Sequence, residues 1–146
     1  MTYIEELFGL SGKVAVVTGA ARGNGKAISI GLARAGADLV VCDLLVDELT
    51  ETVNEIEKLG CKVNSMICDL SKSNEISRFF DSVSKSVDIL INNAGITMGA
   101  PALEYPKEYW DKTYKINLMA PFELSLAIGR RMKKSGGGSI INITSL

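Results

Sequence analysis

The segment from Thr18 to Gly25 has the residue types and spacing of a turn that holds a phosphate group. It reads Thr-Gly-Ala-Ala-Arg-Gly-Asn-Gly, follows an apolar run at 14–17 and precedes a segment of helical period. When a strand, a glycine-rich turn and a helix follow one another in this order, free backbone N–H groups and the positive end of the helix dipole lie where a pyrophosphate can bind. Asp43 closes the next apolar run, 18 residues after Gly25, near the spacing at which a carboxylate binds ribose hydroxyls. The pattern predicts a dinucleotide site.

The residue types in the chain exclude several kinds of catalytic and metal site. The 146 residues contain no histidine, which excludes a Ser-His-Asp triad and a histidine general base within this sequence. The three cysteines, Cys42, Cys61 and Cys68, have no CxxC spacing, so we expect packing residues or free thiols and neither a disulfide framework nor a zinc site. Acid–base groups must therefore come from other residue types.

Length and composition indicate a single domain over residues 1–146. Hydrophobic residues make up 47% of the chain and charged residues 23%, which are ordinary values for a protein that buries a core. The net charge of −1 gives no broad basic surface, so neither nucleic acid nor a membrane is expected as a partner. The first residues lack the pattern of a secretory signal, and no apolar run is long enough to span a bilayer. We expect a cytoplasmic protein.

Short apolar runs alternate with segments of helical period, which is typical of a parallel sheet covered by crossover helices. The expected strands are residues 14–17, 39–42, 63–67, 87–91 and 140–143. The expected helices are residues 25–35, 47–59, a segment that begins at Ser71 or Ser73 as N-cap and reaches 83, and 106–134. Gly36 should end the first helix as a left-handed cap, and the second helix should stop at Gly60. The predicted fold class is α/β, a Rossmann-type doubly wound sheet.

Asn117 is a polar residue in the last of these helical segments. Trp110, Tyr114, Pro121, Leu124 and Ile128 recur with it at steps of three and four, which predicts one shared apolar face. Because Pro121 has no N–H to offer the Asn117 carbonyl, we expect the helix to kink there. From spacing alone, Asn117 is either a structural amide or a working group.

Several separated motifs resemble those of the short-chain dehydrogenase/reductase family, which are NAD(P)-dependent oxidoreductases. The family's Thr-Gly-x-x-x-Gly-x-Gly turn matches Thr18 to Gly25, its acid after the second strand matches Asp43, and its Asn-Asn-Ala-Gly signature matches residues 92–95. Asp69-Leu70 matches the Asp-Leu that closes the family's third strand. The resemblance runs from about Gly12 to the last residue, and the order and spacing of the motifs make it specific.

The resemblance implies that a nicotinamide dinucleotide binds along these motifs. The residues implied to bind it are Thr18, Gly19, Ala21, Arg22, Gly23, Asn24, Gly25, Asp43, Leu44, Asp69, Leu70, Asn93, Ala94 and Gly95. Asp69 is implied to contact the adenine edge, with a role at the start of the next helix as the structural alternative. Asn92 is implied to tie neighbouring strands together. Asn24 departs from the bulky aliphatic residue that is usual at its position.

The resemblance also implies two members of a catalytic set, Asn117 and Ser145. Ser145 would hold the substrate oxygen while hydride moves, with the neighbouring Thr144 as a competing assignment and a serine in a turn as the structural alternative. The family's Tyr-x-x-x-Lys, which exchanges the proton, lies beyond Ser145, and no tyrosine of this chain has a lysine four residues on. We therefore expect the chain to form the cofactor-binding half of the enzyme, its C-terminal part missing, with little or no turnover alone.

Two residues favour different cofactors. Asp43 favours NAD, because its charge would repel the extra phosphate of NADP by about 4 kcal/mol per charge pair at ~4 Å and an effective dielectric of roughly 20. Arg22 is a basic residue of the kind that often accompanies NADP, so NADP remains possible while NAD is favoured.

The implied reaction moves hydride between the nicotinamide and a small alcohol or ketone, of sugar, polyol or ketoacyl type. The intact protein is expected to be a homodimer or homotetramer. The alternative is a catalytically inactive NAD(P)-binding module or truncated fragment. An epimerase or dehydratase of the related long-chain group is disfavoured by the glycine spacing.

Overall fold

The computed structural model describes residues 2–83 and 86–144. Within these residues the chain forms a five-stranded parallel sheet of strand order β3-β2-β1-β4-β5. The strands are β1 (Val14–Thr18), β2 (Asp38–Asp43), β3 (Val63–Ile67), β4 (Ile89–Asn92) and β5 (Ser139–Asn142). The predicted strands and the α/β class are confirmed, with strand ends shifted by at most two residues.

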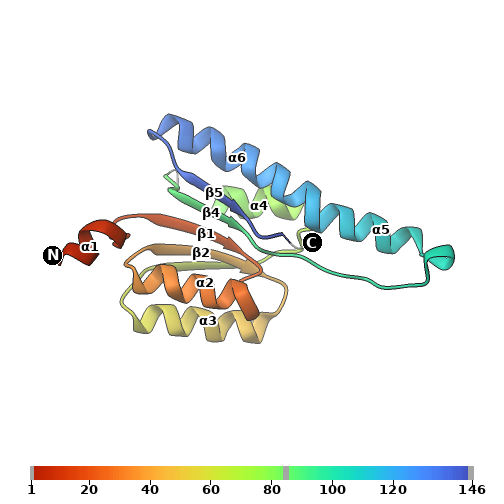
Figure 1. Ribbon diagram of the computed structural model, residues 1–146, viewed down its shortest axis with the longest axis horizontal. Coiled ribbons are helices and arrows are strands. Elements are labelled where there is room, and N and C mark those ends of the chain that lie inside the picture. Colours follow the sequence, from red (N-terminus) through yellow and green to blue (C-terminus); the bar gives the residue numbers. More distant parts are fainter. Residues whose placement is uncertain (1, 84–85, 145–146) are drawn as a thin grey trace.

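Helices cover both faces of the sheet. They are α1 (Tyr3–Phe8), α2 (Gly23–Arg34), α3 (Val46–Lys58), α4 (Ser73–Ser82), α5 (Lys107–Tyr114) and α6 (Ala120–Lys134), with a 3-10 turn at Ala102–Glu104 and a π-helix at Lys115–Met119. In Figure 1, α2 and α3 lie on one face and α4 and α6 on the other, while α5 extends past the sheet. The helices described by the structure are too short or too polar to cross a bilayer.

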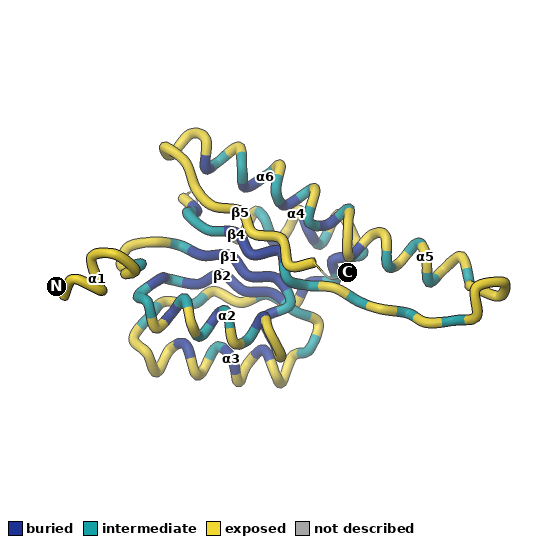
Figure 2. The backbone as a smooth tube through the Cα atoms, viewed as in Figure 1, coloured by how far each residue is buried: buried dark blue, intermediate teal, exposed yellow. Residues whose placement is uncertain are grey.

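The alternation of side chains along β1 explains the two layers. Ala15 and Val17 pack into the core shared with α2 and α3, whereas Val16 packs into the core shared with α4 and α6. Because both faces are covered, the central strands are continuously apolar. Figure 2 shows the contrast with β5, which is exposed along its whole length.

The ends of the first helices follow the predicted chemistry, but the start of α4 does not. Gly36 and Gly60 have φ values of +99° and +82°, as expected for left-handed residues after a helix. The expected serine N-cap of α4 is wrong, because Lys72 occupies the N-cap position and provides no side-chain hydrogen bond. The Ser71 hydroxyl instead donates to the Asp69 carboxylate at 2.7 Å.

The long helical segment after residue 106 is interrupted by the π-helix. The Ala120 N–H donates to the Lys115 carbonyl, five residues back, directly before Pro121. This wider turn shifts the helical register, so Ile116 and Ala120 are buried where an apolar face through Asn117 was predicted. Asn117 itself is exposed. From there on, the buried residues are Leu124, Ile128 and Met132, of which Leu124 and Ile128 agree with the prediction.

Candidate functional site

The order of the strands reverses between β1 and β4. From β1 the sheet runs through β2 to β3 on one side, and the chain then returns to place β4 on the other side. In open α/β sheets, the crevice outside the carboxyl ends of the strands at such a point is where ligands bind. A cavity of about 450 Å³ lies there, and we call it the groove.

Most of the predicted cofactor residues line the groove: Gly19, Arg22, Gly23, Asn24, Asp43, Leu44, Leu70, Asn93, Ala94 and Gly95. Four further lining residues were missed by the sequence analysis: Leu45, Cys68, Ile96 and Ile116. The first three follow directly after, or two to four residues after, the ends of β2, β3 and β4. That position in the sequence is the signal that could have found them, whereas Ile116 comes from the distant π-helix.

The glycines of the first turn form a cradle. Gly19 and Gly23 have φ values of +67° and +54°, a region that side chains disfavour. A Cβ at Gly25 would lie 1.9 Å from the Gly19 carbonyl oxygen, so only glycine lets α2 approach the turn this closely. A Cβ at Gly23 would meet nothing within 4 Å, which means that the space beside this residue is open.

The start of α2 faces the groove without a side-chain cap. Arg22 is the N-cap residue and makes no capping hydrogen bond. The N–H groups in the first turn of a helix have no intrahelical acceptor, and together they carry the positive end of the helix dipole. Gly23 and Asn24 at this end line the groove, so an anionic group placed there would meet free N–H donors.

Asp43 joins the turn to the end of β2. Its carboxylate accepts hydrogen bonds from the N–H of Ala21 at 2.9 Å, of Leu44 at 2.7 Å and of Leu45 at 3.2 Å. The residue is half-buried and lines the groove. The carboxylate therefore organises the backbone on both sides of the groove edge, a role that the sequence analysis did not predict.

Thr18 and Asn93 join the ends of β1 and β4. The Thr18 hydroxyl accepts hydrogen bonds from the N–H groups of Asn93 and Ala94, both at 3.1 Å. The Asn93 amide donates in return to the carbonyls of Thr18 at 3.0 Å and Gly19 at 3.1 Å. Thr18, like Ala21 and Gly25, is buried and shapes the groove from behind.

Asp69 is not among the described residues that line the groove, and its carboxylate contacts its own neighbours in sequence. Its carboxylate accepts hydrogen bonds from the N–H and the hydroxyl of Ser71 at 2.9 and 2.7 Å, and it pairs with Lys72 at 3.3 Å. Partial burial opposes ionisation, but these contacts outweigh it and lower the pKa of the Asp69 carboxyl. These bonds build the turn that leads into α4, which is the structural alternative for this residue.

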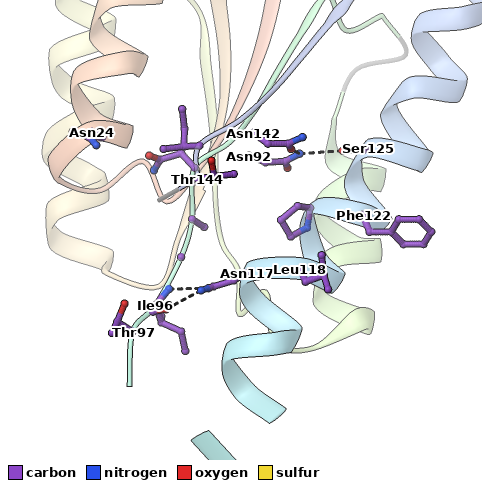
Figure 3. A pocket seen from close by; sticks show the side chains of 15 residues that line it. Asn24, Asn92, Ile96, Thr97, Asn117, Leu118, Phe122, Ser125, Asn142 and Thr144 are labelled. Carbon is purple, nitrogen blue, oxygen red and sulfur yellow. Dashed lines mark hydrogen bonds between the residues drawn. The ribbon is translucent and has the colours of Figure 1, made fainter. Parts of the chain in front are cut away.

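Asn117 lines a second cavity of about 1040 Å³ that adjoins the groove along residues 93–96. Its amide donates to the Ile96 carbonyl at 2.8 Å and accepts from the Ile96 N–H at 2.9 Å (Figure 3). The side chain thus joins the π-helix to the segment after β4, as a structural amide does. Thr144 also lines this cavity, while Ser145 lies outside the described residues.

Asn92 ties β4 to β5 and to α6, as the resemblance implied. Its Nδ2 donates to Asn142 Oδ1 at 2.9 Å and to Ser125 Oγ at 3.0 Å; Figure 3 shows the Ser125 contact. The Asn92 side chain is buried, and its Oδ1 accepts no hydrogen bond from any described residue.

The three cysteines are free thiols; Cys68 lines the groove directly after β3, and Cys42 is buried near the end of β2. The neighbouring Cys68 thiol, and then burial, raise the pKa of Cys42. The same neighbour lowers the pKa of Cys68, against the effect of desolvation. Among the described residues, no group of three or more His, Cys, Asp or Glu side chains could hold a metal ion.

Known proteins share this fold. A 2-dehydro-3-deoxy-D-gluconate 5-dehydrogenase of Pseudoalteromonas atlantica is 42% identical over 145 residues, which cover 97% of this chain and 57% of that protein. The crystal structure of a metagenomic short-chain oxidoreductase in complex with NADP has a TM-score of 0.89 at 40% identity, covering 94% of this chain and 64% of that one. A 7α-hydroxysteroid dehydrogenase complexed with NADH and 7-oxo glycochenodeoxycholic acid has a TM-score of 0.90 at 38% identity, covering 99% and 57%.

The chain spans little more than half the length of most of these relatives. The family model for short chain dehydrogenases matches it from residue 13 to residue 146. Because that match takes in every strand of the sheet as well as the groove, the chain belongs to the short-chain dehydrogenase family.

Proposed function

We propose that the groove binds a nicotinamide dinucleotide and that the chain is the cofactor-binding part of an oxidoreductase. The observation that carries the proposal is the arrangement at the switch point, where the uncapped start of α2 and the Asp43 carboxylate line the same groove. The similarity to proteins whose structures contain NADP or NADH supports it. When bound, the nicotinamide would accept or supply the hydride exchanged with a small alcohol or carbonyl compound.

The residues of the groove fit the chemistry of this ligand. The open space beside Gly23 and the first N–H groups of α2 suit a diphosphate. Asp43 offers a carboxylate to the hydroxyls of a ribose, and Leu44 and Leu70 offer apolar surface next to it. Asn93, with Ala94 and Gly95, lines the opposite wall, toward the second cavity.

We propose NAD as the preferred cofactor. The Asp43 carboxylate stands at the groove edge and would repel a phosphate on the ribose, as argued from the sequence. Arg22 is exposed and lines the same groove, and its positive charge favours NADP. The balance between these two side chains decides the choice.

In a protein of the relatives' length, Asn117 and Ser145 are proposed members of the catalytic set. Asn117 would act by holding the backbone of Ile96 in place, because its side-chain oxygen and its side-chain nitrogen both form hydrogen bonds there. Ser145 would hold the substrate oxygen. The 146 residues contain no Tyr-x-x-x-Lys, a pair whose proton transfer contributes roughly 10²–10⁴-fold to rate. This absence favours a second candidate function for the chain by itself, a dinucleotide-binding module without turnover.

A homodimer or homotetramer is the proposed assembly. Trp110, Tyr114, Leu118, Phe122 and Leu126 follow one another at steps of four along α5, the π-helix and α6, and all are exposed. An apolar surface of this extent is typical of a protein interface.

The test is a calorimetric titration of the chain with NADH and, in a separate experiment, with NADPH. We expect NADH to bind more tightly than NADPH, and no turnover of alcohols or ketones by the 146 residues alone. Folded protein that binds neither cofactor would contradict the proposal, and turnover by the chain would contradict the non-catalytic module.

A further inference from the structure

Thr52 on α3 reaches the glycine turn from behind. The residue is completely buried. Its hydroxyl lies 3.1 Å from the Ala20 carbonyl oxygen and 3.2 Å from the Ala21 carbonyl oxygen, although these residues are 32 and 31 positions away in sequence. A third acceptor, the Glu48 carbonyl, lies 3.1 Å away and is the usual partner of a threonine inside a helix. The hydroxyl proton is thus shared between the helix and the turn.

The two carbonyls of the turn depend on this donor. Ala20 and Ala21 are 0% and 1% exposed, so water has little access to their backbone. Neither carbonyl accepts a hydrogen bond from any other group in the described part of the chain. Buried backbone carbonyls are nearly always paired in folded proteins. The Thr52 hydroxyl is therefore needed as the hydrogen-bond donor to these two carbonyls.

The N–H groups of this turn are anchored to the end of β2. The N–H groups of Gly19 and Ala20 donate to the Cys42 carbonyl at 2.8 and 3.2 Å. The Ala21 N–H donates to the Asp43 carboxylate at 2.9 Å. Thr52 is therefore the contact from α3 that determines how the Ala20 and Ala21 peptide groups are oriented, and Arg22 and Gly23 follow directly.

We infer that Thr52 is a positioning residue for the dinucleotide: its hydroxyl orients the Ala20 and Ala21 peptide groups and thereby the first N–H groups of α2. The inference rests on the proposed function. Thr52 is not among the described residues that line the groove, so it acts only through the turn.

Three substitutions separate the hydroxyl from the rest of the side chain. Thr52→Ser keeps the donor, Thr52→Ala lacks it, and Thr52→Val replaces it with a methyl group of similar size. Thr50→Val is the matched control, because the exposed Thr50 on the same helix uses its hydroxyl only for the Val46 carbonyl at 2.8 Å. The readouts are the dissociation constant for NADH and hydrogen exchange of the backbone amides in 19–25, with 89–92 as the reference.

We expect Thr52→Ser and Thr50→Val to behave like the unchanged chain. Thr52→Ala and Thr52→Val should weaken NADH binding by roughly three- to tenfold, the range expected for one hydrogen bond. Exchange should become faster in 19–25 and stay unchanged in 89–92. A role in overall stability alone would instead accelerate both segments equally.

Equal NADH affinity and equal exchange in the serine and alanine variants would overturn the inference. So would a failure of both the alanine and the valine variants to fold, because Thr52 would then serve the whole fold. If the unchanged chain and Thr50→Val bind neither NADH nor NADPH, the proposed function fails, and the exchange data alone then decide whether Thr52 orients the turn.

Discussion

The turn at the ends of β1 and β2 and the edge strand β5 differ in how much of their surface contacts other parts of the chain. At the turn after β1, each peptide group from Gly19 to Ala21 is bonded by β2, α3 or β4. Ile140 and Ile141 on β5 and Ile143 directly after it are between 38% and 48% exposed. The turn is preorganised by contacts within the described residues, whereas the β5 edge is not covered by them. We therefore expect the groove to bind its ligand without further contacts, and the exposed β5 edge to associate with another protein surface.

The strongest test of the preorganised turn is Gly25→Ala. Its Cβ would lie 1.9 Å from the Gly19 carbonyl oxygen, which is backbone and cannot move aside cheaply. We expect the free energy of unfolding to fall by about 3 kcal/mol or more, at the upper end for overpacking, with loss of NADH binding. The measurement is urea denaturation together with a cofactor titration.

Gly31→Ala is the matched control on the same helix. Gly31 is exposed, and a Cβ there would meet nothing within 4 Å. This variant should gain about 0.5–1 kcal/mol, because alanine is favoured over glycine inside a helix. If both variants have the same stability, the close approach of α2 to the turn is not what requires glycine at position 25.

The β5 side of the comparison is tested by Ile141→Lys. Ile141 is 48% exposed on the edge strand, and burying an isoleucine against a second molecule is worth about 1.5–3 kcal/mol. We expect the unchanged chain to self-associate and the lysine variant to associate at least roughly tenfold more weakly. Sedimentation velocity measures both. A chain that stays monomeric, and unfolds cooperatively without the substitution, would show that the exposed edge needs no partner.

Asp43→Asn tests whether the groove edge selects the cofactor. The change removes the charge, and a hydrogen bond to a charged group is worth about 1.5–3 kcal/mol. We expect NADH binding to weaken and NADPH binding to weaken less, so that their ratio moves toward NADPH. Arg22→Gln should move the ratio the other way, because Arg22 is exposed at the same edge. Equal losses for both cofactors would mean that Asp43 acts only by holding the backbone N–H groups of Ala21, Leu44 and Leu45.

Local residue patterns predicted the parts of the fold that depend on neighbours in sequence. The strands, the glycine turn and the left-handed Gly36 follow from apolar runs and from backbone conformations that only certain residues accept. The π-helix did not follow in the same way: Pro121 predicted an interruption of the helix, but not that the Ala120 N–H would bond the Lys115 carbonyl five residues back.

The site residues divide along the same line. Arg22 and Asp43 lie in motifs, and both line the groove. Ile116 reaches the groove from a helix far away in sequence, and Thr52 reaches the turn from α3. Thr52 did leave a signal, because it falls on the buried stripe of Leu49 and Ile56 and is polar. A polar residue on such a stripe must find a partner, but the sequence does not say which one.

The smallest effect is expected at the other end of the sheet, away from the groove. Asp88 Oδ2 accepts a hydrogen bond from the Val14 N–H at 2.9 Å, and Oδ1 pairs with Lys13 at 3.0 Å. The Val14 bond first, and then Lys13, lower the pKa of Asp88 against the effect of burial. Since the pKa is lower in the folded protein, the stabilisation is present above the unfolded value of about 3.9 and is lost as the pH falls through the folded value.

Asp88→Asn should therefore cost about 1 kcal/mol of unfolding free energy at neutral pH, and the difference from the unchanged chain should shrink in acid. Urea denaturation at neutral pH and near pH 3 measures both values. Lys13→Met is the control, because this lysine is half-exposed and a surface pair contributes about 0–1 kcal/mol. NADH affinity at neutral pH should be unchanged in both variants, since the groove lies at the opposite strand ends. A loss of affinity in Asp88→Asn would show that the turn depends on the whole of β1 and β4 as well as on its local hydrogen bonds.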